Sequence, residues 1–91
     1  MDLKWTARAL SDLARLHDFL AIANGQAAAR AIRALIVAPI RLLERPRLGE
    51  RLEEFAPREV RRIIVSRYEL RYEIRDATVI VLRLWHTRED R

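Results

Sequence analysis

The sequence predicts a single domain of the α+β class, in which a helical hairpin packs on a small antiparallel sheet. Two stretches in the first half carry apolar residues at helical spacing, and three stretches in the second half are β-branched or alternate between apolar and charged residues. A short apolar segment precedes both groups. The expected order of elements is β-α-α-β-β-β, and strands that follow helices as a block are typical of this class. A chain of 91 residues is enough for one domain, which we place at residues 1–91.

The first two elements are a short strand and a helix. Residues 1–5 contain two large apolar side chains and precede Thr6, which is suited to cap a helix. A helix is expected at residues 7–23, where leucines recur at helical spacing among charged positions. Asn24 and Gly25 should end it, because both residues tolerate the left-handed conformation of a helix C-terminus.

The second helix is expected at residues 26–45, and its apolar surface extends beyond one stripe. Pro39 lies inside the pattern and should kink or break the helix, because proline lacks the backbone donor. The two helices should form an antiparallel hairpin, since about two residues join them. The wide apolar surface indicates burial on more than one side, and therefore a protein partner.

The second half begins with a loop at residues 46–59, which Phe55 should pin to the core. A strand follows at 60–66. The clearest alternation of the chain then runs over residues 68–75, with apolar residues on one face and charged residues on the other. Asp76-Ala77 should form a tight turn into the last strand.

The last strand, residues 78–86, is apolar on nearly every position, so it should lie inside the sheet with both faces covered. In so short a chain the helices can cover one face of this strand. The other apolar face would then need a partner protein to cover it, which is a further indication of a partner. Strict alternation predicts the two faces. They would carry Ile80, Leu82, Leu84 and His86 on one side, and Val79, Val81, Arg83 and Trp85 on the other.

Composition narrows the possible functions. The absence of cysteine excludes disulfides, thiolate zinc sites and cysteine nucleophiles. No apolar run is long enough to span a membrane and no signal peptide is visible, so the chain is expected to be cytoplasmic. The net charge is +5 and the sequence pI about 10.9, with Lys4 the only lysine. Arginine binds carboxylates and phosphates bidentately, which suits an anionic partner.

Few residues are candidates for chemistry. There is no glycine-rich phosphate loop, no zinc-ligand spacing and no Ser/His/Asp pattern, so no metal or cofactor is expected. His86, at the end of the last strand, could act with Arg62 and Arg71 in a ribonuclease, the arginines holding the phosphodiester and the histidine moving a proton. A histidine at a strand end is also commonly structural. Arg83 either pairs with a glutamate on the next strand or faces a partner.

Five segments together resemble the RelE/ParE superfamily of bacterial toxins. They are WTARALSDL (5–13), PRLGER (46–51), VRRIIV (60–65), YELRY (68–72) and LRLWHTRED (82–90), and the resemblance extends over essentially the whole chain. The ending from Arg83 to Asp90 is similar to the ParE branch. Ribosome-dependent ribonucleases of the RelE branch often carry a tyrosine near the C-terminus, whereas here Thr87 follows His86 and no tyrosine follows Tyr72.

The resemblance implies a toxin that inhibits DNA gyrase and blocks replication, and that is not itself an enzyme. A ParD-like antitoxin would bind it in a hetero-oligomer and would contact operator DNA, so that the toxin meets operator DNA only indirectly. The alternative is a ribosome-dependent mRNA endonuclease that uses His86, Arg62 and Arg71. We expect target contacts at Arg83, His86 and Arg88. The residues expected to bind the antitoxin are Leu16, Leu20, Ile32, Ile36, Tyr72 and Trp85.

Overall fold

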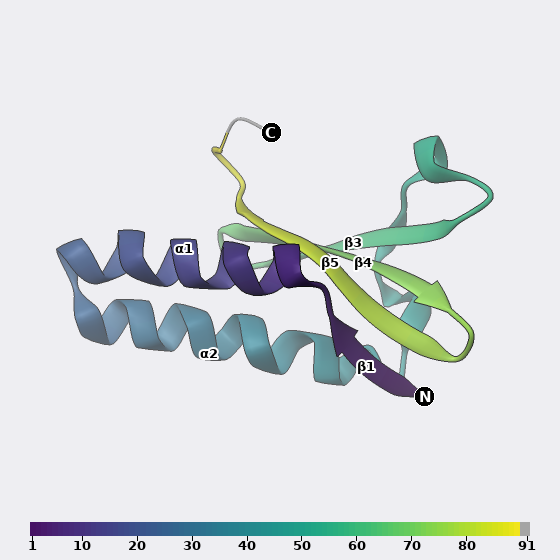
Figure 1. The fold of residues 1–91 in the computed structure, drawn as a ribbon, viewed down its shortest axis with the longest axis horizontal. Helices are drawn as coiled ribbons and strands as arrows, with labels where there is room; N and C mark the ends of the chain where they lie inside the picture. Colours follow the sequence, from purple (N-terminus) through teal and green to yellow (C-terminus); the bar gives the residue numbers. More distant parts are fainter. Residues whose placement is uncertain (90–91) are drawn as a thin grey trace.

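The computed structural model describes residues 1–89 and has the predicted α+β fold. The helical hairpin of α1 (Ala7–Ala23) and α2 (Gly25–Arg41) lies against one face of the sheet (Figure 1). Within the described residues the sheet has five strands: β1 (Asp2–Trp5), β2 (Glu50–Arg51), β3 (Glu59–Val65), β4 (Tyr68–Arg75) and β5 (Thr78–His86). Two short 3-10 turns, η1 (Pro46–Leu48) and η2 (Glu53–Phe55), lie on either side of β2.

The sheet is mixed, which corrects the prediction of a purely antiparallel one. Its strand order is β1-β5-β4-β3-β2, and β3, β4 and β5 form the expected antiparallel meander. β1, however, pairs with β5 in parallel. A parallel pair requires a long connection, and here almost the whole chain separates the two strands. β2 was not predicted, because two residues are too few to show any periodicity.

The ends of α2 also differ from the prediction. Asn24 is extended, with φ −163°, and its side chain accepts hydrogen bonds from the N–H groups of Gln26 and Ala27, both at 3.0 Å. It therefore caps the start of α2 instead of adopting a left-handed conformation at the end of α1. The helix then continues past the buried Pro39 and ends at Arg41, not near residue 45.

A bulge in β5 overturns the predicted assignment of its faces. Arg71 pairs with Arg83 and Tyr72 with Val81, so that Leu82 is an extra residue without an opposite partner. One extra residue reverses the side on which every later side chain lies. The face toward the helices therefore carries Val79, Val81, Leu84 and His86, and the opposite face carries Thr78, Ile80, Arg83 and Trp85.

The core lies between the hairpin and this inner face of the sheet. It is built mainly from leucines of α1, α2 and β4 and from valines of β5. β5 lies between β1 and β4, as predicted for an interior strand, and the Asp76-Ala77 turn that precedes it has both residues in the left-handed region, with φ 51° and 55°. Neither helix in residues 1–89 is long and apolar enough to cross a membrane.

Candidate partner-binding groove

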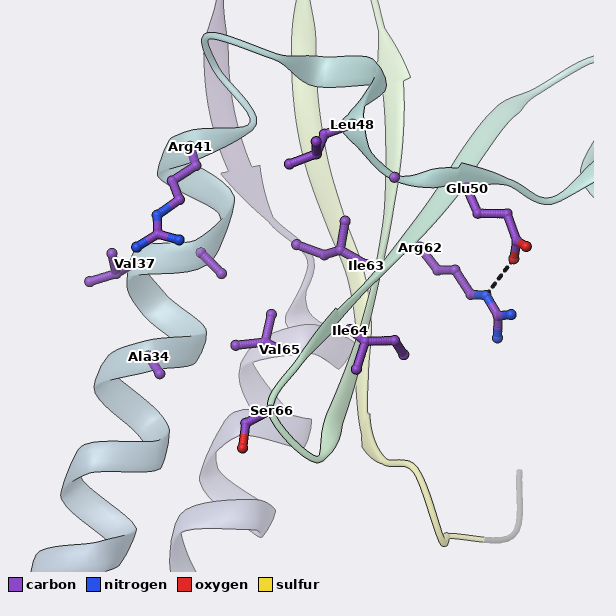
Figure 2. Close-up of a pocket in the computed structure, with 12 residues that line it drawn as sticks. Ala34, Val37, Arg41, Leu48, Glu50, Arg62, Ile63, Ile64, Val65 and Ser66 are labelled. Carbon is purple, nitrogen blue, oxygen red and sulfur yellow. Dashed lines mark hydrogen bonds and ion pairs between the residues drawn. The ribbon is translucent and has the colours of Figure 1, made fainter.

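A groove of about 640 Å³ runs between α2 and the outer edge of β3 (Figure 2). Most of its lining is apolar and comes from α2, from β3 and from the turn that leads to β2. Two of these side chains are large and well exposed, Leu48 by 52% and Val37 by 43%. Ile64 is 57% exposed and borders the groove from the edge of β3, with its side chain on the same sheet face as Arg62. The apolar lining residues are Ala34, Val37, Ala38, Leu48, Ile63, Ile64 and Val65.

The groove is open for two local reasons. On the α2 side the groove is lined by the small residues Ala34 and Ala38, so the helix does not fill the space beside the strand. On the sheet side, β2 pairs only with Arg61 and Arg62, and the rest of β3 has no strand along its outer edge in the described sheet. Contiguous exposed apolar surface of this kind is typical of interaction sites.

The wall formed by Leu48 is held in place by Tyr72. The Tyr72 hydroxyl donates a hydrogen bond to the carbonyl oxygen of Pro46 at 2.6 Å and accepts one from the Gly49 N–H at 3.0 Å. Burial raises the pKa of Tyr72, although the Gly49 hydrogen bond opposes the shift, and the hydroxyl therefore keeps its proton as a donor. This makes Tyr72 a support of the groove from behind.

Arginines surround the apolar lining. Arg41 and Arg62 line the groove itself, and hollows that continue along α2 add Arg30, Arg33 and Arg67. Arg62 pairs with the exposed Glu50 at 2.7 Å. The sequence contains no acidic residue at positions 19–43, so the α2 side of the groove is uniformly basic. Such a surface suits a partner segment that combines apolar side chains with carboxylates.

Three of the residues predicted to bind the antitoxin have buried side chains in the free chain. Leu16 and Tyr72 belong to the core, and Trp85 is buried on the other face of the sheet. There the guanidinium groups of Arg71 and Arg83 lie over the Trp85 ring, 4.6 and 5.1 Å from its centroid.

The other three predicted contacts remain partly or fully accessible. Leu20 and Ile32 are half-buried beside the core, and Ile36 is exposed on α2, but none of the three lines the groove. Sequence reasoning missed Leu48 and the edge of β3. The alanines at 31, 34 and 38, spaced at helical intervals, were the signal that one side of α2 leaves space beside β3.

The predicted ribonuclease residues lie on opposite faces of the sheet. Arg62 and Arg71 are neighbours on the face away from the helices, where both pair with the buried Glu69, at 3.4 and 3.3 Å. His86 lies on the inner face, with its ring 5.4 Å from that of Tyr68. The structure therefore does not bring the three side chains together.

The expected target-binding residues are divided in the same way. Arg83 lies on the outer face and pairs with Asp12 of α1, at 2.8 and 3.2 Å, a partner that the sequence did not reveal. His86 and Arg88 share a separate hollow of about 460 Å³ beside α1, where the Arg88 N–H donates to His86 Nδ1 at 3.1 Å. Asp90, the last residue of the ending that resembles the ParE branch, lies outside the described residues.

Known proteins share both the sequence and the fold. Residues 3–91 match the family described as the ParE toxin of type II toxin–antitoxin system, parDE. Toxin RelE2 of Caulobacter vibrioides is 35% identical over 82 residues, which are 90% of each chain. A chromosomal ParDE system from P. aeruginosa matches with a TM-score of 0.79 and 21% identity, over 94% of this chain and 95% of that one. The intact E. coli RelBE toxin–antitoxin complex matches with a TM-score of 0.61 and 20% identity, over 99% of this chain and 98% of that one.

The two structural matches support the fold, and the sequence matches establish the family. The chain belongs to the ParE toxin family of type II toxin–antitoxin systems, within the RelE/ParE superfamily.

Proposed function

We propose that this chain inhibits DNA gyrase, and thereby blocks replication, until a ParD-like antitoxin binds the groove between α2 and β3 and neutralises it. Membership of the ParE toxin family over residues 3–91 is the main observation behind this proposal. Both the toxin and its target would act in the cytoplasm. The antitoxin would carry the contact with operator DNA.

The groove supports the antitoxin part of the proposal. An apolar lining at an unoccupied strand edge, surrounded by arginines, is complementary to an acidic segment with apolar side chains. Val37 and Ile22 allow a matched test, because both are exposed β-branched residues on helices but only Val37 lines the groove. Val37→Asp should abolish co-purification with the co-encoded antitoxin, while Ile22→Asp should leave it intact.

The positions of the candidate catalytic residues favour a binding protein over a nuclease. A general acid or base must lie within hydrogen-bond distance of the reacting group. The cationic side chains that stabilise the transition state must contact the same group. In a ribonuclease site, His86 and the two arginines would therefore have to lie around one phosphodiester. His86 faces the helices, whereas Arg62 and Arg71 lie on the opposite face and already hold Glu69. A gyrase inhibitor needs surface complementarity and no such constellation.

Two observations support a second candidate function, that of a ribonuclease. The relative that is 35% identical carries the name Toxin RelE2, and Arg62 and Arg71 stand side by side in register on an accessible sheet face. A ribosome-dependent mRNA endonuclease that uses His86, Arg62 and Arg71 is therefore the second candidate. It would require a target-induced movement that brings His86 to the arginines.

The deciding experiment incubates the toxin, freed from its antitoxin and refolded, with gyrase and supercoiled plasmid. We expect supercoiling activity to fall and linear DNA to accumulate only when both proteins are present, and antitoxin added first should prevent both effects. His86→Ala should retain this activity. Unchanged gyrase together with mRNA cleavage on ribosomes, lost in His86→Ala by about 10²–10⁴ in rate, would establish the alternative.

A further inference from the structure

The turn that follows β5, Thr87–Glu89, is held by the side chain of His86. The Arg88 N–H donates a hydrogen bond to His86 Nδ1, with 3.1 Å between the two nitrogens. A backbone N–H can only donate, so Nδ1 must offer a lone pair, and the imidazole must be neutral with its proton on Nε2. The closed form of the turn therefore contains the neutral form of His86.

The same turn forms one wall of the hollow beside α1. The Thr87 N–H donates to the carbonyl oxygen of Arg67, and the Glu89 N–H donates to that of His86, both at 2.9 Å. The Glu89 carboxylate also forms an ion pair with Arg15 of α1. The turn is thus fixed by a few local contacts, and His86 makes two of them.

The surroundings of His86 offer little to an extra positive charge. Within residues 1–89, the titratable or charged side chains that line the hollow with His86 are Arg15 of α1, Tyr68 of β4, and Arg88 and Glu89 of the turn. The Tyr68 ring meets the imidazole edge to face, with the ring centroids 5.4 Å apart. The one carboxylate among these groups already pairs with Arg15. A charged imidazole would therefore lie beside two cations and find no unpaired carboxylate in the described hollow.

A proton and the Arg88 N–H compete for the same lone pair. Protonated imidazole carries N–H groups on both ring nitrogens. Nδ1 and the Arg88 nitrogen would then face each other as two donors, and the hydrogen bond would be lost. Histidine changes its charge between about pH 5 and 8, a range in which carboxylates stay ionised and arginines stay protonated. Acidification within this range therefore acts on the turn through His86.

We propose that His86 is a pH-sensitive latch on the C-terminal turn. Neutral His86 holds Thr87–Glu89 closed against α1, and protonated His86 releases the turn and opens the hollow. Opening uncovers the apolar wall that α1 contributes through Leu16, Phe19 and Leu20. The inference concerns the free chain and does not depend on gyrase or on an antitoxin.

Nuclear magnetic resonance of the isotope-labelled chain tests the latch directly. At about pH 8 the chemical shifts of the His86 ring nitrogens should report an unprotonated Nδ1 and a protonated Nε2. On acidification to about pH 5.5 the ring should gain a proton, and the heteronuclear NOE of the Arg88 and Glu89 amides should fall. We expect exchange of the Arg88 amide, relative to its intrinsic rate at each pH, to rise about fivefold or more. Unchanged amide signals of β4 would show that the sheet stays folded.

Two substitutions at His86 separate the acceptor from the ring. An asparagine side chain hydrogen-bonds the backbone two residues on and does not titrate, so His86→Asn should keep the turn closed at every pH. His86→Phe keeps an aromatic ring against Tyr68 but lacks the acceptor, so its turn should be open at every pH. His17→Asn removes the other histidine of the chain and should leave the pH response unchanged. Circular dichroism and thermal unfolding verify the fold of each variant.

Three results would overturn the inference. The first is a turn whose amides keep the same order between about pH 8 and 5.5, whether or not the ring gains a proton. The second is a turn that becomes more ordered in acid, which would show that the charged imidazole pairs with Glu89. The third is a full pH response in His86→Asn. A response that is lost in both His86 variants and kept in His17→Asn would establish the latch.

Discussion

Asp12 of α1 accepts a hydrogen bond from the backbone N–H of Leu84 in β5, with its Oδ2 2.9 Å from the nitrogen. β1 pairs with β5 only as far as Val81, so beyond that point a helix side chain takes the place of a neighbouring strand. Arg83 pairs with the same carboxylate. This edge of the sheet is therefore closed from within the chain, whereas the edge of β3 at Ile64 has no strand beside it in the described sheet.

Removing the Asp12 carboxylate should destabilise the fold. Asp12→Ala leaves the Leu84 N–H without its acceptor and deprives Arg83 of its partner, and we expect a loss of about 2–4 kcal/mol in the free energy of unfolding. Asp18→Ala is the matched control on the same helix, where the side chain is 84% exposed, and it should change stability by less than about 0.5 kcal/mol. Urea unfolding followed by circular dichroism measures both. Equal effects would show that the Asp12 contact does not stabilise the sheet edge.

Stability should fall in acid. Burial alone would raise the pKa of Asp12, but hydrogen bonds from Arg83 and the Leu84 amide, together with the Arg83 charge, lower it below its ordinary value. The hydrogen bonds from Arg58 lower the pKa of Glu73 in the same direction, against the effect of burial. A lowered folded-state pKa contributes stability above the unfolded pKa, at about 4, and this stability is lost as the pH falls further. Urea midpoints should therefore drop below about pH 4.5. The decline should be shallower in Asp12→Asn, and an identical slope would argue against the Asp12 contribution.

A methyl group at Gly49 should damage the groove. A Cβ built there would lie 2.6 Å from the carbonyl oxygen of Arg62 and 2.7 Å from the Tyr72 hydroxyl, both too close. We expect Gly49→Ala to cost about 1–3 kcal/mol and to weaken antitoxin binding by displacing Leu48. Gly25→Ala is the control, because nothing lies within 4 Å of its Cβ, and it should be neutral or slightly stabilising at the start of α2. Thermal unfolding measures the stability of both variants, and titration with the antitoxin measures their binding. Equal results for the two variants would contradict the prediction.

Removing the Tyr72 hydroxyl alone should destabilise the chain. Tyr72→Phe keeps the packing but leaves the Pro46 carbonyl and the Gly49 N–H without their partner, at an expected cost of about 1–3 kcal/mol. Tyr68→Phe is the comparison, because the contact of Tyr68 with His86 is made by the ring and survives the change. If both variants unfold at the same urea concentration, the turn at residues 46–49 does not depend on the hydroxyl.

The candidate site was less predictable than the fold, and particular residues show why. The alternation at residues 68–75 and the leucine spacing at 7–23 are local patterns, so they were sufficient to place β4 and α1. The edge of β3 is open at Ile64 because β2 ends before it. The end of β2 could not be predicted, because a strand of two residues shows no sequence pattern. Leu48 enters the groove only because Tyr72, distant in the sequence, holds its turn.

The sequence by itself determined the class of the fold and the order of the predicted elements, because helical and strand periodicity follow from the backbone geometry of each segment. Only the tertiary structure decided which residues share a face. The bulge at Leu82 reverses β5, placing His86 under the helices and Arg83 with Arg62 and Arg71 on the other face. The parallel pairing of β1 and the open edge of β3 were decided in the same way, because strand register and neighbours depend on contacts between segments far apart in the chain.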